Sequence, residues 1–248
     1  MEITSTNNDL VKSCSKLLQK KYRTETGKFL LEGFKAIKEA FDYGINIEKI
    51  FVNKDNVSDY SFAKDLIIET TSAVLKKLSS TESEPPAVAV AYQKKYDIND
   101  FSKFKKVILL ENIKDLGNLG TIIRSAVAFG AEGIVLYGES ADIYNPKCVR
   151  SAVGNLWKIP FVYVNDFKIL DKVFAKFSKV ATLPRSRNML KQFECKYPVL
   201  IMFGAESDGL SKELTDYATD SVKIEMNENV ESLNLASSVS VILYELFM

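Results

Sequence analysis

Short apolar runs alternate with helical periodicity throughout the second half of the chain. The runs lie at 106–111, 133–137, 161–164, 179–183, 198–203 and 221–226. Between and after them, apolar residues recur every three to four positions, at 120–130, 145–154, 171–177 and 234–247. Apolar runs that alternate with helices are typical of a parallel sheet covered on both faces. We therefore predict an α/β domain over residues 104–248.

The first 95 residues carry a second, smaller α/β pattern. Strands are predicted at 29–31, 47–53 and 86–93, and a helix that carries Ile37 and Phe41 inward ends near Gly44. Residues 96–103 have few large aliphatic side chains and many charges, so we place a linker there. The predicted organisation is a domain over 1–95, a linker over 96–103 and the α/β domain over 104–248.

A basic amphipathic helix is predicted over residues 8–25. Its apolar residues recur at helical spacing, and the rest of its surface is basic. The basic residues are Lys12, Lys16, Lys20, Lys21 and Arg23. Two interpretations stay open: a solvated helix face, or a surface that contacts phosphates.

Composition narrows the classes of protein that the chain can represent. Hydrophobic residues make up 46% and charged residues 26%, which is typical of a globular protein. The formal net charge is only +1, so a nucleic-acid partner would need locally concentrated positive charge. The N-terminal residues are polar, and no apolar run approaches the roughly 18–20 residues that span a bilayer. We expect a cytoplasmic protein with no membrane segment.

Cysteine and histidine usage excludes several kinds of site. The three cysteines, Cys14, Cys148 and Cys195, are far apart, which argues against a zinc ribbon or a disulfide scaffold. The chain has no histidine, which excludes Ser-His-Asp and Cys-His catalysis and an HExxH metal site. No metal site is predicted, so chemistry would fall to Arg, Lys, carboxylates, amides, hydroxyls or backbone groups.

Three segments of the second domain join an apolar strand to a loop rich in Gly, Asn or Ser. In the first, over 111–130, Gly117, Asn118 and Gly120 precede a helix that carries Arg124. Glycines there permit close backbone approach to a ligand. The spacing matches neither the GxGxxG dinucleotide motif nor a phosphate-binding P-loop. Taken alone, this segment is equally well a tight strand–helix turn with a surface arginine.

The other two segments follow later strands. Over 200–211, an apolar strand runs into Gly204, Glu206 and Gly209, and Glu206 could be a solvated carboxylate or a helix N-terminal charge. Over 224–246, a polar loop leads to Ser232 and Asn234, either of which could be a helix N-cap.

Taken in order, the three segments resemble the signature motifs of the SpoU (TrmH-type) RNA 2′-O-ribose methyltransferases of the SPOUT superfamily. The first matches at Asp115, Gly117, Asn118, Gly120, Arg124, Ala126 and Gly130; the second at Gly204, Glu206, Gly209 and Leu210; and the third at Ile224, Met226, Glu231, Ser232, Leu233, Asn234, Tyr244 and Glu245. The resemblance spans about residues 104–248. Residues 27–41 more weakly resemble the family's L30e-like RNA-binding domain.

The resemblance implies a fold, a cofactor and a reaction. The fold is a SPOUT domain with a deep trefoil knot plus an N-terminal L30e-like domain, and the family works as a homodimer. S-adenosylmethionine would bind through four cofactor-binding residues, Gly204, Ile224, Met226 and Leu233. Its methyl group would pass to a ribose 2′-hydroxyl, with ribosomal RNA favoured over transfer RNA. The implied catalytic residues are Arg124, Asn118, Glu206, Ser232 and Asn234.

The role of Arg124 stays open between a base and a clamp. The family proposal is that the arginine activates the 2′-hydroxyl, yet free guanidinium has a pKa above ~12 and rarely deprotonates. It could instead hold the adjacent phosphate and orient the 2′-oxygen. Glu206 could hold Arg124 or a loop amide.

Three other functions compete with ribosomal RNA methylation. The chain could methylate transfer RNA, or it could be a non-catalytic RNA-binding or ribosome-assembly protein on the same fold. A nucleotide-dependent enzyme of Rossmann type would require the GxGxxG motif that the sequence lacks.

Overall fold

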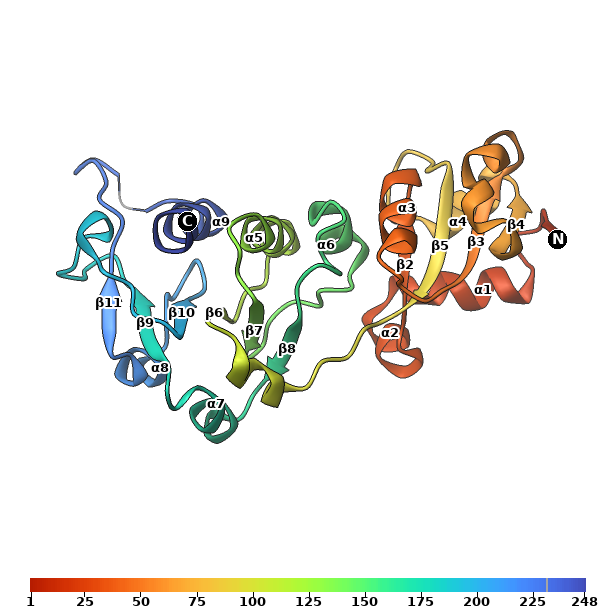
Figure 1. Cartoon of the computed structure of the whole chain (residues 1–248). Coiled ribbons are helices and arrows are strands. Elements are labelled where there is room, and N and C mark those ends of the chain that lie inside the picture. Colours follow the sequence, from red (N-terminus) through yellow and green to blue (C-terminus); the bar gives the residue numbers. More distant parts are fainter. Residues whose placement is uncertain (231) are drawn as a thin grey trace. The chain divides into compact units, whose positions relative to one another are not determined.

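A computed structural model describes residues 1–230 and 232–248, which form two compact units (Figure 1). Unit 1 comprises Met1–Lys94 and Asp142–Lys158, and unit 2 comprises Lys95–Ala141 and Ile159–Met248. Compactness therefore groups residues 142–158 with the N-terminal part, although their sequence continues the motif-bearing half. The predicted domain bounds follow motif boundaries and stay a prediction.

Unit 2 is built on a six-stranded sheet in the order β11-β9-β10-β6-β7-β8, with every pair of neighbours parallel. The strands are β6 (Lys106–Glu111), β7 (Gly133–Tyr137), β8 (Phe161–Val164), β9 (Ser178–Thr182), β10 (Val199–Phe203) and β11 (Asp220–Val222). The prediction of an α/β fold with a parallel sheet is confirmed.

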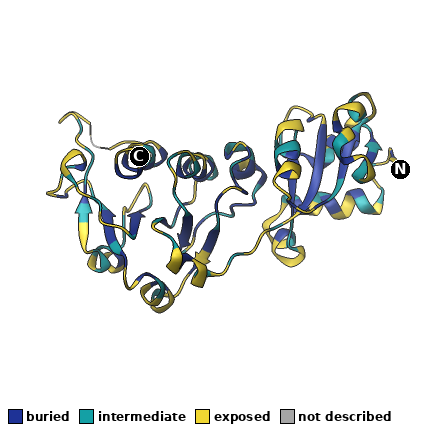
Figure 2. Ribbon diagram, viewed as in Figure 1, coloured by how far each residue is buried: buried dark blue, intermediate teal, exposed yellow. Residues whose placement is uncertain are grey.

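Helices cover both faces of this sheet (Figure 1). They are α5 (Leu116–Ala128), α7 (Phe167–Phe174), α8 (Lys212–Tyr217) and α9 (Leu235–Phe247). Val107 and Leu109 of β6 pack with residues of α7 and α8 in one core cluster. Alternate strand residues point to opposite faces, so Ile108 and Leu110 are buried on the side of α5 and α9. This double burial explains why β6, β7 and β10 are continuous apolar runs, and Figure 2 shows these central strands as buried ribbons, whereas the edge strand β11 is only partly buried.

Unit 1 contains a mixed five-stranded sheet in the order β1-β4-β3-β5-β2. Its strands are β1 (Glu2–Ile3), β2 (Lys28–Glu32), β3 (Ile47–Asn53), β4 (Ile67–Thr70) and β5 (Ala87–Tyr92). Its helices are α1 (Asp9–Ser15), α2 (Lys20–Thr26), α3 (Phe34–Asp42), α4 (Ser72–Leu78) and α6 (Pro146–Ser151). The predicted cap of α6 is present, because the side chain of Asn145 accepts a hydrogen bond from the Lys147 amide and Pro146 occupies the first turn.

The predicted basic helix over 8–25 is not continuous. It divides into α1, a 3-10 helix (Lys16–Leu18) and α2, because Gln19 adopts extended dihedral angles (φ −100°, ψ 137°). Arg23 stabilises this bend: it is 1% exposed and donates to the Leu17 carbonyl oxygen at 2.7 Å. Its guanidinium also pairs with Asp142 at 2.7 Å. Arg23 is thus an internal structural residue, which corrects its prediction as part of the basic surface.

Three boundaries differ from the sequence predictions. Helix α5 starts at Leu116, so Gly117, Asn118 and Gly120 lie within the helix rather than in a preceding loop. Strand β11 ends at Val222 instead of continuing to Met226. Within the predicted linker, residues 98–103 form a 3-10 helix whose Phe101 is fully buried in unit 2.

Other features bear on membrane and metal sites. Among the residues described, none of the helices combines the length and apolarity needed to cross a bilayer. In the same residues, no group of three or more Cys, Asp or Glu side chains is arranged to hold a metal ion. The cysteines are free thiols, and burial raises the pKa of Cys14 and Cys148.

Candidate functional site

The site lies at the carboxyl ends of the unit 2 strands, where loops after parallel strands gather. One side is the first turn of α5, which follows β6. Asp115 is the N-cap of α5, and its carboxylate accepts a hydrogen bond from the Asn118 amide at 2.7 Å. The cap explains why α5 begins before the two glycines, and it places the Asn118 side chain at the mouth of the site.

The loop after β10 forms the second side. Ala205 and Gly209 exchange backbone hydrogen bonds of 3.1 and 2.9 Å, which fold the loop back on itself. Gly204 makes the fold possible, because a Cβ there would lie 1.9 Å from the Gly209 carbonyl carbon. Gly209 has a φ of +66°, a conformation that glycine adopts without steric cost. Both glycines of the second motif are therefore explained by the shape of this loop.

A buried carboxylate anchors the far end of the loop. Glu111, at the end of β6, is 4% exposed and accepts a hydrogen bond from the Ser211 amide at 2.7 Å. Two residues on, Glu213 accepts a 2.6 Å hydrogen bond from the Tyr137 hydroxyl. Burial, reinforced by Glu213, raises the pKa of Tyr137. The loop after β10 is thereby fixed to β6 and β7.

The third side is the start of α9, and it joins the other two. Asn234 caps α9 by accepting from the amides of Ala236 (2.9 Å) and Ser237 (3.3 Å). Its side-chain nitrogen donates to Asn118 Oδ1 at 3.1 Å. Asn118 Nδ2 in turn donates to Glu206 Oε1. The polar side chains of the three motifs therefore form one hydrogen-bonded chain, Asn234–Asn118–Glu206.

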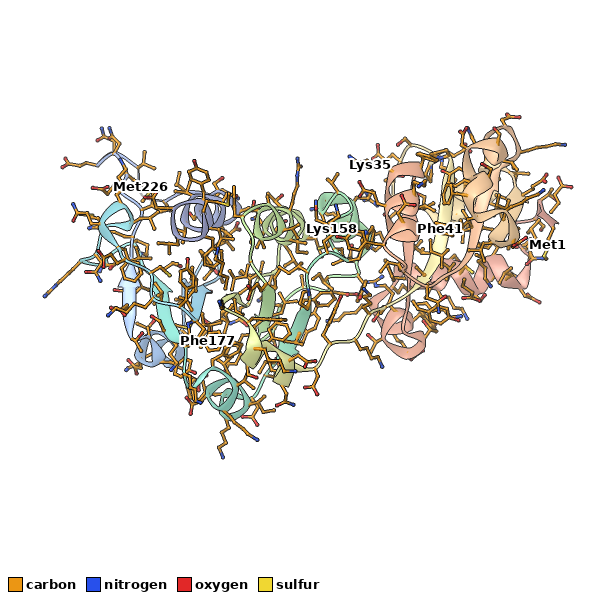
Figure 3. All side chains as sticks on the ribbon, in the orientation of Figure 1. Met1, Lys35, Phe41, Lys158, Phe177 and Met226 are labelled. Carbon is orange, nitrogen blue, oxygen red and sulfur yellow. The ribbon has the colours of Figure 1, made fainter. Side chains whose placement is uncertain are left out.

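A cavity of about 730 Å³ opens beside this chain of side chains. Its walls combine apolar side chains, such as Ile224, Met226 and Leu233, with the backbone of the Gly204–Leu210 loop. Met226, labelled in Figure 3, belongs to the segment between β11 and α9. The volume and the mixture of apolar walls with a few polar groups suit a cofactor-sized ligand. All four predicted cofactor-binding residues line this cavity.

A second cavity, of about 420 Å³, shares Glu206 with the first. It is bordered by Asn118 and Asp115 of the first motif, and by Lys114 and Glu139. Residues 205–208 and Leu235 line both cavities. A ligand in one cavity would therefore adjoin a ligand in the other across the loop that carries Glu206.

The remaining predicted residues lie at different depths. Ser232 lines the larger cavity and is exposed, and Asn234, not Ser232, is the helix cap. Arg124 lies about two turns into α5, and its side chain is exposed. Among residues 1–230 and 232–248, none forms an ion pair or a hydrogen bond with the Arg124 side chain. Glu206 therefore holds the Asn118 amide and not Arg124. Glu231 lies outside the described residues.

Sequence reasoning missed two groups of residues. Thr182 at the end of β9 and the following Leu183 and Pro184 line the larger cavity, but nothing local indicates that β9 neighbours β10. Glu111 stands at the end of an apolar run, and a lone carboxylate in such a run could have marked a buried anchor.

Two family models match the chain. One described as the SpoU rRNA Methylase family matches residues 105–244, and one described as an MRM3-like substrate binding domain matches residues 8–89. The first match contains every residue of the site.

Similar proteins are found at full length. An uncharacterized tRNA/rRNA methyltransferase of Synechocystis is 32% identical over 98% of this chain and 92% of that protein. The 23S rRNA (guanosine(2553)-2'-O)-methyltransferase RlmP of Bacillus subtilis is 29% identical over 99% of this chain and 98% of that protein. The crystal structure of an AdoMet-bound rRNA methyltransferase from Sinorhizobium meliloti superposes with a TM-score of 0.89, at 30% identity, covering 99% of this chain and 96% of that one. The crystal structure of the AdoMet complex of AviRb from Streptomyces viridochromogenes superposes with a TM-score of 0.86, at 28% identity. It covers 96% of this chain and 97% of that one.

Proposed function

The chain belongs to the SpoU rRNA methylase family, and we propose that it transfers a methyl group from S-adenosylmethionine to a ribose 2′-hydroxyl of ribosomal RNA. The observation that carries this proposal is the chain of hydrogen bonds Asn234–Asn118–Glu206 beside a cofactor-sized cavity. The named relatives support the reaction, since RlmP and the Streptomyces viridochromogenes enzyme are both 23S rRNA 2′-O-methyltransferases.

The larger cavity is the proposed cofactor site. Gly204 would present its backbone to the adenosine part, and Ile224, Met226 and Leu233 would pack against it. The apolar walls suit an adenine ring, and the exposed loop amides can hydrogen-bond to its edge. When bound, S-adenosylmethionine would supply a sulfonium methyl group: the bond from this methyl carbon to the 2′-oxygen would form as the methyl–sulfur bond breaks, the thioether would leave, and the hydroxyl proton would pass to the Glu206 carboxylate or to solvent.

The polar residues position the acceptor ribose. Arg124 carries a flexible, exposed guanidinium that can clamp a phosphate next to the reacting nucleotide. The amide of Asn118, fixed by both neighbours, and the hydroxyl of Ser232 would orient the 2′-oxygen and the cofactor. Asn234 holds Asn118, and Glu206 offers its second carboxylate oxygen to the 2′-hydroxyl as an acceptor. Arg124 thus acts as a clamp in this proposal.

Several finer features accompany the proposal. A trefoil knot in unit 2 is part of the proposal, on the resemblance of the three motifs to the SPOUT superfamily. A homodimer is supported by the exposed Val241 and Tyr244 on α9. The match of residues 8–89 to a substrate binding domain supports an RNA-binding, L30e-like N-terminal domain. The action of RlmP on 23S rRNA supports a cytoplasmic location.

Labelled methyl transfer tests the proposal. The protein is incubated with labelled S-adenosylmethionine and, separately, 23S rRNA, 16S rRNA or total tRNA, and the nucleosides are resolved by mass spectrometry. A 2′-O-methylnucleoside from rRNA is expected. Product from tRNA alone would make the chain a tRNA methyltransferase. RNA binding with no transfer to any substrate, ribosomal subunits included, would indicate the non-catalytic alternative.

A further inference from the structure

The segment that comprises α1, the bend and α2 carries an excess of positive charge. Between residues 9 and 26 the chain has five basic and two acidic side chains, a net charge of +3 against +1 for the whole protein. Arg23 is buried with Asp142, which leaves four exposed lysines facing solvent. These are Lys12, Lys16, Lys20 and Lys21. Positive charge is thus local although the chain is nearly neutral.

The bend brings two of these lysines to a single aromatic ring. Lys16 Nζ lies 5.4 Å and Lys21 Nζ 5.8 Å from the centre of the Tyr22 ring. On a straight helix, residues five apart point about 140° away from each other, since each residue turns about 100°. The extended Gln19 removes that constraint, and Arg23, through the Leu17 carbonyl, stabilises the bend. The lysine pair is therefore a product of the buried arginine.

The ion pairs of this segment leave Lys16 and Lys20 uncompensated. Lys12 lies 3.7 Å from Asp9 and Lys21 4.0 Å from Glu25, which are weak contacts at an exposed surface. Lys16 and Lys20 have no acidic partner among the residues that the structure describes. The ammonium groups of Lys16 and Lys21 both lie near the Tyr22 ring, so the phosphates of one RNA backbone could pair with both.

We propose that Lys16 and Lys21, which the bend brings to Tyr22, and the adjacent exposed Lys20 are the patch through which the N-terminal unit binds the phosphate backbone of the substrate RNA. The occupant is RNA rather than an acidic protein, because the match to a substrate binding domain covers these residues. Such contacts hold RNA without reading its sequence. This inference rests on the proposed function and adds the surface that contacts the substrate.

The test compares charge-reversal variants in the full-length protein. Lys16→Glu/Lys21→Glu is compared with Lys168→Glu/Lys172→Glu, which reverses two exposed lysines on α7 of unit 2. Filter binding to 23S rRNA transcribed in vitro is measured between about 50 and 200 mM salt. The patch variant should bind roughly tenfold more weakly, and its plot of log K against log salt should lose about one unit of slope per lysine. The α7 variant should match wild type.

Further measurements separate the possible outcomes. The affinity for S-adenosylmethionine and the thermal midpoint of Lys16→Glu/Lys21→Glu should equal those of wild type, and Lys16→Gln/Lys21→Gln should give an intermediate RNA affinity. Unchanged RNA affinity and salt slope in the charge-reversal variant would overturn the patch while leaving the methyltransferase proposal intact. If wild type binds RNA through the patch but transfers no methyl group, the proposed function fails and the patch stands.

Discussion

Asn234 donates a 3.1 Å hydrogen bond to Asn118 and so joins the start of α9 to the first turn of α5. The two residues are 116 positions apart in the chain. Both residues also take part in helix capping. Asn234 is the N-cap of α9, and the backbone amide of Asn118 donates to Asp115, the N-cap of α5. A single contact therefore couples the stability of two helix ends to the geometry of the site.

This double role of Asn234 can be separated by one substitution. Asn234→Ser keeps an N-capping oxygen but loses the amide that donates to Asn118, so the free energy of unfolding should change by less than about 1 kcal/mol. The kcat for methyl transfer should fall by roughly ten- to hundredfold, because Asn118 is no longer held. Asn145→Ser at the cap of α6 is the matched control and should leave kcat unchanged. Equal kcat in both variants would contradict a positioning role for Asn234.

The backbone of the loop after β10 should be intolerant of even one added methyl group at Gly204. A Cβ there would lie 1.9 Å from the Gly209 carbonyl carbon and 2.1 Å from the Leu210 nitrogen, so Gly204→Ala must displace the loop. We expect the Kd for S-adenosylmethionine to rise at least about tenfold by calorimetry. Gly130→Ala, at a φ of +77° with open space around it, adds backbone strain of about 1–2 kcal/mol without touching the cavity. If Gly204→Ala and Gly130→Ala bind S-adenosylmethionine with the same Kd, the result would argue against the assigned cofactor site.

Removal of the buried Arg23 in unit 1 should strongly destabilise the folded protein. Arg23→Ala leaves the nearly buried Asp142 carboxylate without its partner and should lower the free energy of unfolding by about 3–5 kcal/mol. Lys21→Ala, which removes an exposed contact of 4.0 Å, should cost less than about 1 kcal/mol. Urea denaturation gives the free energy of unfolding of both variants. Similar losses of unfolding free energy in the two variants would mean that Arg23 does not stabilise the bend.

Two buried tyrosines with raised pKa values should respond differently to loss of the hydroxyl group at neutral pH. Burial raises the pKa of Tyr60 to about 12, and its buried hydroxyl has no partner among the described residues. A raised folded-state pKa gives stability that is complete below the unfolded value near 10 and is lost as pH rises through the folded value. Tyr60→Phe should therefore match wild type or exceed it at neutral pH, and it should lose less stability between pH ~10 and ~12.

Tyr137→Phe provides the contrast. It removes the 2.6 Å hydrogen bond to Glu213, so it should cost about 1 kcal/mol already at neutral pH. Thermal midpoints from pH 7 to 12 compare both variants with wild type. A loss at neutral pH in Tyr60→Phe, equal to that in Tyr137→Phe, would show that the Tyr60 hydroxyl is satisfied in the folded protein.

The sequence predicts the strands of unit 2 well because both faces of that sheet are buried. Every residue of β10, for example, is buried, so the strand is a continuous apolar run. The start of α5 was predicted wrongly, since the glycines at 117 and 120 favour a loop and the cap at Asp115 overrides them. The break at Gln19 has no local signal either. It depends on Arg23 and on Asp142, a partner 119 positions away.

The candidate site, like the fold, was predictable where the signal is local and not where it depends on contacts between distant residues. The motif loops could be found from sequence because Gly, Asn and Ser cluster after apolar strands. Their mutual contacts could not, because Asn118, Glu206 and Asn234 meet only once the strand order is known. The assignment of Glu206 to the Asn118 amide rather than to Arg124 comes from the fold alone.

The most direct test of the central claim is methyl transfer by Arg124→Ala beside calorimetric binding of S-adenosylmethionine. Arg124 is exposed on α5 and does not line the larger cavity, so the cofactor Kd should stay within about twofold of wild type. Transfer to 23S rRNA should fall by about two orders of magnitude or more, because the acceptor loses its charged clamp. Arg124→Ala protein that methylates RNA at the wild-type rate would contradict the account.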